Sequence, residues 1–262
     1  MVIQSYMSVI TKVYYTFIIN YFQLMRIKIF LIVLFLYVCS HIHSQVFKIV
    51  FESGLGTYSM TDLKEINSEV QKIYPFNTKV VSDFPPYFYY EPGIMLKSGK
   101  ISLGLVYSFQ SAGSRVSVKD YSGEYRYDMK VNSNSPGIYW DVEIWSKNNF
   151  ELSLYSTFKV AFSKLRTNEY FILLDSLIRN DFYNFRAKTY NCEPGIRLTR
   201  SLGFFTFGID AGYSVDLYRK AFHKTENKEI LLINPGNQMT AKPNWNGFRF
   251  GISAIIHLNN NS

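Results

Sequence analysis

The stretch FFTFGIDAGYSVDLY, residues 204–218, decides the fold. Side chains of a strand point alternately to opposite faces. Here the odd-numbered positions are all apolar or aromatic, whereas most even-numbered positions are small or acidic. Strands of soluble domains usually run about 5–6 residues, whereas a strand that crosses a bilayer needs about 9–11 residues with an apolar outer face. We therefore interpret this segment as a membrane-spanning strand of a barrel.

The same alternation recurs along the chain after residue 45 and predicts an all-β fold. Short connections alternate with long ones, as in an eight-stranded antiparallel up-and-down transmembrane β-barrel with short periplasmic turns and long outer loops. The expected strands are 47–58, 87–97, 101–110, 125–145, 150–162, 184–200, 204–218 and 245–258. The expected short connections are 97–100, 146–149 and 200–203, and the long ones are 59–86, 111–124, 164–183 and 219–244.

The first long connection is expected to contain a short helix over 61–74. Pro75 ends this helix because proline cannot continue one. Such a helix would pack on the rim of the barrel or bind a partner as a helix in a groove. The apolar run 170–174 suggests a second short helix in the connection 164–183. The apolar residues that recur at helical spacing in the first helix are Leu63, Ile66, Val70 and Ile73.

The residues before Val46 are typical of an exported protein. The apolar run 29–39 follows Arg26 and Lys28 and precedes a polar stretch that ends at Ser44-Gln45, which is the pattern of a cleaved signal peptide. The run is shorter than the roughly 20 residues of a spanning helix, and the alternative, an uncleaved anchor over 13–39, would contain both basic residues. We predict an upstream extension at 1–24, a signal peptide at 25–44 and an outer-membrane β-barrel domain at 45–262.

A Pro-Gly-Ile sequence recurs in three of the expected strands, several residues before a short turn in each case. Proline cannot donate a hydrogen bond to a strand ladder. Its recurrence at matching positions therefore predicts a bulge or a bend in each of these strands. The residues given this structural role are Pro92, Gly93, Pro136, Gly137, Pro194 and Gly195.

These motifs resemble the Bacteroidetes outer-membrane β-barrel domain family. The resemblance covers about residues 45–258 and includes the leader that ends in Ser-Gln, the Pro-Gly-Ile strands, and the Gly54-x-Gly56-x-Tyr58 strand that runs into a helix with Leu63-Lys64. It implies a small outer-membrane barrel and no catalytic residues, since most members have no assigned activity. It also implies a C-terminal insertion signal, which 249–258 fits in polarity but not in aromatic content.

Alternation places many charged side chains inside the expected barrel. An eight-stranded barrel is just wide enough for side chains to fill its interior, so charges there must pair or lose their charge. We interpret them as a plug of ion pairs; the alternatives are a proton or ion path, or catalysis by paired carboxylates such as Asp141 and Glu143. The candidates for lumen ion pairs are Glu52, Glu91, Asp141, Glu143, Glu151, Lys159, Glu193, Arg197, Asp210 and Arg249.

No catalytic, cofactor-binding or metal site is predicted. The histidines after residue 45 are His223 and His257, and no Cys/His cluster with zinc spacing or glycine-rich phosphate loop occurs. A Ser–His couple, as in outer-membrane lipid A deacylases, would need an outward histidine, and His257 is expected to face inward. We therefore predict a non-enzymatic protein without a cofactor.

Three functions remain open: a barrel that presents extracellular loops for binding, an accessory factor in outer-membrane secretion or assembly, and a lipid-modifying enzyme. We favour the first. The expected partners are outer-membrane lipid, the barrel-assembly machinery for insertion, and an extracellular or periplasmic partner. Nucleic acid is not expected, because the 25 basic and 20 acidic residues after residue 45 give a net charge of only +5, spread without a basic block. A soluble calycin-like barrel with its apolar faces inward is the alternative fold.

Overall fold

The computed structural model describes residues 46–73, 78–174 and 176–258. The expected upstream extension and signal peptide lie outside these residues. Among the described residues there are ten strands and one helix, and every strand pairing is antiparallel. The elements are β1 (Val46–Gly56), α2 (Thr61–Ile73), β2 (Lys79–Asp83), β3 (Tyr87–Ser98), β4 (Ile101–Asp120), β5 (Gly123–Lys147), β6 (Phe150–Leu173), β7 (Ser176–Leu202), β8 (Phe205–Arg219), β9 (His223–Lys224) and β10 (Gly247–His257).

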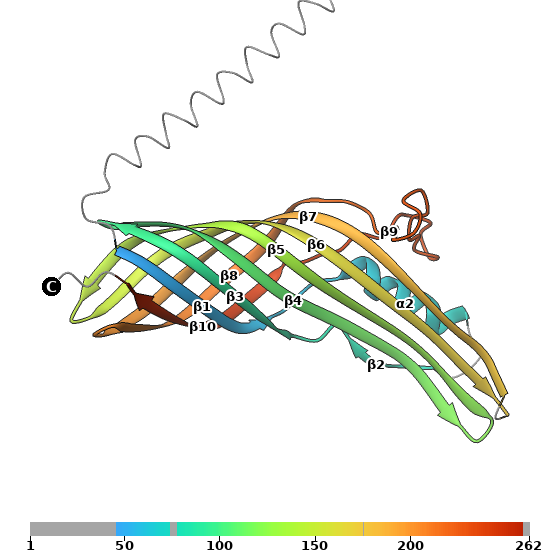
Figure 1. Cartoon of the computed structure of the whole chain (residues 1–262). Helices are drawn as coiled ribbons and strands as arrows, with labels where there is room; N and C mark the ends of the chain where they lie inside the picture. Colours follow the sequence, from blue (N-terminus) through green and yellow to red (C-terminus); the bar gives the residue numbers. More distant parts are fainter. Residues whose placement is uncertain (1–45, 74–77, 175, 259–262) are drawn as a thin grey trace, which may run out of the picture. The chain divides into compact units, whose positions relative to one another are not determined.

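The strand pairings run around the sheet and return to their start. From β4 they pass through β3, β1, β10, β8, β7 and β6 to β5, and β5 pairs with β4 along nearly its whole length. β2 and β9 lie off this path, on β4 and β7 respectively. The expected count of eight strands is therefore wrong, because these two short strands are added to the sheet (Figure 1).

Two of the expected long loops are strands. Residues 111–120 continue β4, and residues 164–173 and 176–183 continue β6 and β7, so the suggested helix at 170–174 is wrong. The connections at these ends are only 121–122 and 174–175. The prediction failed because the membrane pattern does not continue beyond the apolar band: there the buried face holds apolar residues such as Val116 and Leu165, and the exposed face holds polar residues such as Arg166.

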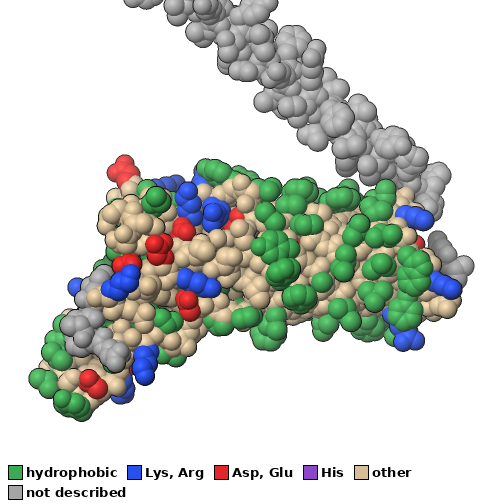
Figure 2. All heavy atoms as spheres, turned by 180° about the vertical axis from the view of Figure 1, so that it is seen from behind, with side chains coloured by type: hydrophobic (Ala, Val, Ile, Leu, Met, Phe, Trp, Pro, Cys, Tyr) green, Lys and Arg blue, Asp and Glu red, His purple; other side chains and the backbone are tan. Residues whose placement is uncertain are grey.

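The two faces of the strands have the sidedness that the alternation predicts. Phe205, Phe207, Phe248 and Phe250 are exposed on the outer face, whereas Glu52, which is 4% exposed, is buried on the inner face. Figure 2 shows hydrophobic side chains gathered over one half of the visible face, while most acidic and basic side chains lie toward the other end. An exposed apolar band of this extent needs a partner such as lipid.

The Pro-Gly pairs interrupt the strand ladder on one side only. At Pro92, for example, the β3–β4 pairing skips two residues and resumes without a change of register, while the β1–β3 pairing is continuous. The same happens at Pro136 toward β6 and at Pro194 toward β8. No extra residue is inserted at these sites, so the interruptions are not bulges.

The glycines that follow these prolines make room in the lumen. A Cβ on Gly195 would collide with the ring of Tyr155, and a Cβ on Gly137 would collide with the stem of Lys159. Tyr155 is buried and stacks on Tyr139, with 5.8 Å between ring centroids. Glycine is required here because a large inward side chain crosses its backbone.

We expect Gly195→Val to lower the free energy of unfolding by about 1–3 kcal/mol, the usual cost of overpacking an interior. Urea denaturation of the protein folded in lipid vesicles measures this change. Ala211→Val, which adds methyl groups to the outer face beside Ile196, is the matched control and should leave stability nearly unchanged. Equal stability of the two variants would show that Tyr155 is not held against Gly195.

Candidate functional site

Arg249 and Lys159 hold two carboxylates at the centre of the lumen. Lys159 Nζ lies 2.7 Å from Glu91 Oε2 and 2.7 Å from Glu193 Oε2. Arg249 pairs with the same two carboxylates, at 3.0 Å from Glu91. Its guanidinium also lies 3.6 Å from the centroid of the Tyr89 ring. Two cations thus neutralise two acids that come from different strands, which is the arrangement that a buried charge requires.

Arg197 is the centre of a second cluster. Its Nη2 lies 2.6 Å from Glu52 Oε2, and its Nε pairs with Asp210. Its Nη1 donates to the Tyr139 hydroxyl at 2.9 Å, and that hydroxyl donates to Asp141 Oδ2 at 2.8 Å. The Tyr89 hydroxyl donates to Glu52 Oε1 at 2.6 Å and so links this cluster to the one around Arg249.

A third cluster lies toward the short-turn end of the strands. Lys97 Nζ lies 2.7 Å from Glu143 Oε2 and 2.6 Å from Glu151 Oε2. His257 Nε2 is 2.9 Å from the Thr206 hydroxyl. These side chains are partly exposed, and a nearby cavity of about 20 Å³ is lined in part by Arg197 and His257. Such a cavity holds about one water molecule.

The structure brings the lumen candidates together in these three clusters. Asp141 takes part through the hydrogen bond that it accepts from the Tyr139 hydroxyl. Asp141 and Glu143 share a strand but lie in different clusters, because Glu143 binds Lys97. Each of these two carboxylates thus has its own hydrogen-bond partner.

An apolar cluster fills the other end of the lumen. Trp245 is fully buried at its centre, where its ring meets Tyr58 edge-on at 4.8 Å and its Nε1 donates to the Ser163 hydroxyl at 2.9 Å. The backbone N–H of Trp245 donates to Asp216 Oδ2 at 2.8 Å. The apolar residues of the cluster are Tyr58, Met60, Leu63, Ile66, Phe84, Ala112, Met129, Val131, Ala161, Leu165, Phe185, Ala187, Phe222, Ala241 and Trp245.

Helix α2 is part of this apolar cluster. Leu63 and Ile66 are buried in it, and Asp62 accepts a hydrogen bond from the Lys242 backbone at 2.9 Å. The outer loop 219–246 is held in the same way, through Phe222 and Trp245. Figure 1 shows α2 against the inner side of the long strands. The helix therefore covers the end of the lumen, and its apolar face is already occupied.

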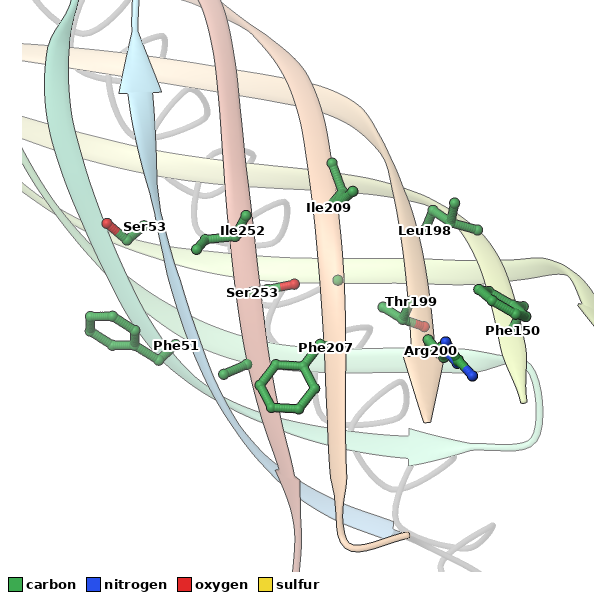
Figure 3. A pocket seen from close by; sticks show the side chains of 12 residues that line it. Phe51, Ser53, Phe150, Leu198, Thr199, Arg200, Phe207, Ile209, Ile252 and Ser253 are labelled. Atoms are coloured by element: carbon green, nitrogen blue, oxygen red, sulfur yellow. The ribbon is translucent and has the colours of Figure 1, made fainter. Parts of the chain in front are cut away.

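A hollow of about 490 Å³ lies on the outer face of the apolar band, away from the lumen charges (Figure 3). Its walls include Phe51, Phe207 and Ile252, and Ala254 is the small residue between them. Arg200 lies at one side, 5.3 Å from the centroid of the Phe150 ring. The hollow is lined almost wholly by carbon atoms, so it suits an acyl chain better than a polar substrate.

The structure also contains an outer sheet, of which the sequence predicted only the parts at 125–134 and 184–187 as strand. Its hairpin tips and free side carry exposed apolar residues, among them Tyr121, Leu174 and Phe182. Another part of the sheet has a sequence signal in the alternation at 112–118, which is weak because both faces contain serine. This outer sheet consists of β2 with residues 111–120 of β4, 123–134 of β5, 163–173 of β6 and 176–187 of β7.

The tip of the first outer hairpin is closed by Asp120. Its Oδ1 accepts from the Ser122 hydroxyl at 2.6 Å, the Ser122 N–H at 2.8 Å and the Gly123 N–H at 3.1 Å. These hydrogen bonds, first that of the Ser122 side chain, lower the pKa of the Asp120 carboxyl. The tip is therefore a defined turn whose geometry depends on an ionised aspartate.

Within the described residues, no helix is long and apolar enough to cross a membrane. In the same part of the chain, no three His, Cys, Asp or Glu side chains gather as a metal site. No protein-family model and no curated protein sequence matches this chain.

Several solved outer-membrane proteins have similar structures at low identity. Ail of Yersinia pestis, the attachment invasion locus protein, is 12% identical, with 81% of this chain and 97% of that chain covered and a TM-score of 0.34. The outer-membrane protease OmpT of Escherichia coli is 8% identical, with 82% and 96% covered and a TM-score of 0.36. The translocator domain of the autotransporter NalP of Neisseria meningitidis is 10% identical, with 84% and 91% covered and a TM-score of 0.28. These likenesses are too distant to assign a site.

We expect Arg249→Met to lower the free energy of unfolding by about 3–5 kcal/mol, because Glu91 and Glu193 would then share Lys159 alone in a buried site. Urea denaturation in lipid vesicles again measures the change. Arg186→Met, at an exposed position of β7, is the matched control and should cost less than about 1 kcal/mol. If both variants unfold at the same urea concentration, the lumen ion pairs do not hold the fold together.

Proposed function

We propose that the eight longer strands of the ten-stranded sheet close into a barrel that crosses the bacterial outer membrane and carries the outer sheet as a rigid binding surface. The observation that carries this proposal is the length of four successive strands. β4, β5, β6 and β7 have 20, 25, 24 and 27 residues, although a bilayer needs only about 9–11. The excess forms ordered sheet beyond the apolar band.

The pairing of β4 with β5 supports closure, because each of the eight longer strands then has two neighbours. A closed barrel leaves no bare edge in the lipid. The outward apolar residues and the buried inward charges support a membrane position. The short connections 99–100, 148–149 and 203–204 lie together at one end, which in barrels of this type faces the periplasm. The outer sheet then lies outside the cell.

The filled lumen favours binding at the outer sheet over catalysis or transport inside the barrel. Its charges neutralise one another, and the Trp245 cluster with α2 covers its outer end. The lipid partner would contact the apolar band, and the assembly machinery would contact β10, the strand that pairs with β1. The remaining partner would be a macromolecule bound outside. Membership of the Bacteroidetes family and export through a cleaved signal peptide belong to the same proposal.

The membrane orientation can be tested with single cysteines, in a chain whose own two cysteines are replaced by serine. Tyr121→Cys at an outer tip should react with a membrane-impermeant maleimide on intact cells. Lys147→Cys at a short turn should react only after the outer membrane is permeabilised. Both positions are exposed, so a difference in labelling reports the side of the membrane and not burial within the protein. If only the Lys147→Cys variant is labelled on intact cells, the orientation is the reverse of the one proposed. If neither variant is labelled, the protein is not in the outer membrane as proposed.

The purified protein should form no ion channel in planar lipid bilayers. The reason is that paired charges and the Trp245 cluster fill the lumen in the described part of the chain. Single-channel recording measures this directly, and the labelling pattern above confirms that the recorded protein is folded and inserted. Steady conductance of the inserted wild-type protein would contradict a sealed lumen and favour the ion-path alternative.

A further inference from the structure

The outer part of β7 is an edge of the sheet. β8 accompanies β7 only as far as Thr189, and β9 only at Phe185 and Arg186. β6 pairs with one edge of 176–183, and among the described residues no strand pairs with the other edge. Natural proteins usually protect such edges with charges, proline or very short strands. This edge carries two charged residues, Arg179 and Asp181, and a register shift against β6 at Ile178, but it also carries exposed apolar residues, including Ile178 and Phe182, which are 58% and 64% exposed.

The backbone of this edge is oriented for pairing. The Asn184 carbonyl points away from β6, because it accepts a hydrogen bond from the Thr225 N–H at 2.9 Å. Backbone groups alternate in direction along a strand. Those of Phe182 and Asn180 therefore point outward as well, and they present donors and acceptors to a further strand.

The side chains of this edge are complementary to themselves. If a second copy pairs antiparallel with Asn180 facing Asn180, Arg179 of each copy faces Asp181 of the other, and Ile178 faces Phe182. Opposite charges and apolar pairs across strands are both favourable. Arg179 already lies 3.0 Å from Glu169 and 3.4 Å from Asp181 of its own chain. In the paired arrangement, Asp181 of the second copy takes the place of the chain's own Asp181 beside Arg179.

We propose that the partner of the outer sheet is a second copy of this chain, which adds to the β7 edge by antiparallel pairing centred on Asn180. This inference rests on the proposed function, since it names the partner of that binding surface. Such an interface is twofold symmetric, with the same residues on both sides. Main-chain hydrogen bonds provide the attraction and the facing side chains set the register.

The antiparallel geometry also determines where the two barrels lie. β6 and β7 run without a break from the apolar band into the outer sheet (Figure 1). A strand paired antiparallel with β7 runs in the opposite direction, so its barrel lies at the far end of the joined sheet. The contact would therefore join two facing membranes and would make cells or vesicles cluster.

Charge exchange between two variants tests the pairing. Arg179→Asp places an aspartate opposite Asp181, and Asp181→Arg places an arginine opposite Arg179, so each variant alone should lose self-association by about tenfold or more. A mixture of the two should recover it, because the introduced aspartate of one variant then faces the introduced arginine of the other. Lys119→Asp, on the other outer hairpin, should associate like the wild type. Dimerisation in detergent by sedimentation, and clustering of vesicles that carry two dyes, are the two measurements.

The wild type should form dimers in detergent and cluster vesicles, and recovery by the mixture alone would establish the register. Monomeric wild-type protein, or a mixture as monomeric as its components, would overturn the proposal. Dimers in detergent without vesicle clustering would overturn the facing arrangement. The detergent measurement needs no bilayer, and cysteine labelling reports insertion separately. Failure of self-pairing is therefore distinguishable from failure of the membrane assignment.

Discussion

The structure depends on the neutralisation of charges inside the sheet. Because the outer face of the strands is apolar, their inner face must hold nearly all the polar groups of the apolar-band segments. Arg249 and Arg197 each bind two carboxylates there. A buried charge without a partner is costly. Removal of one member of a cluster therefore leaves its partners with an uncompensated charge. The strands are thus linked across the lumen as well as through their ladders.

The two ends of the lumen are filled by different kinds of side chain. The end near the short turns is filled by ion pairs, and the other end by the cluster around Trp245. α2 and the loop 219–246 contribute to that cluster, so both segments are part of the core. What remains available for a partner is the outer sheet, whose four long strands give it a rigid backbone.

The sequence predicts well where the environment is regular. Along 204–218 one face is apolar and exposed and the other is small or acidic and buried, so the alternation is strong and the strand was recognised. Along 164–183 the exposed face is no longer consistently apolar, and the segment was expected to be a loop with a helix. The short strands β2 and β9 have too few residues to show a period. Prediction from alternation therefore fails outside the apolar band for a physical reason.

The sequence by itself determined which side chains face outward and which face inward, because this depends only on the period of two along each strand. It could not determine which charges meet. Arg197 binds Glu52, which is 145 residues away, and this contact depends on the registers of all the strands between them. Only the tertiary structure decided that the lumen is closed by Trp245 and α2, and that β7 ends in an unpaired edge.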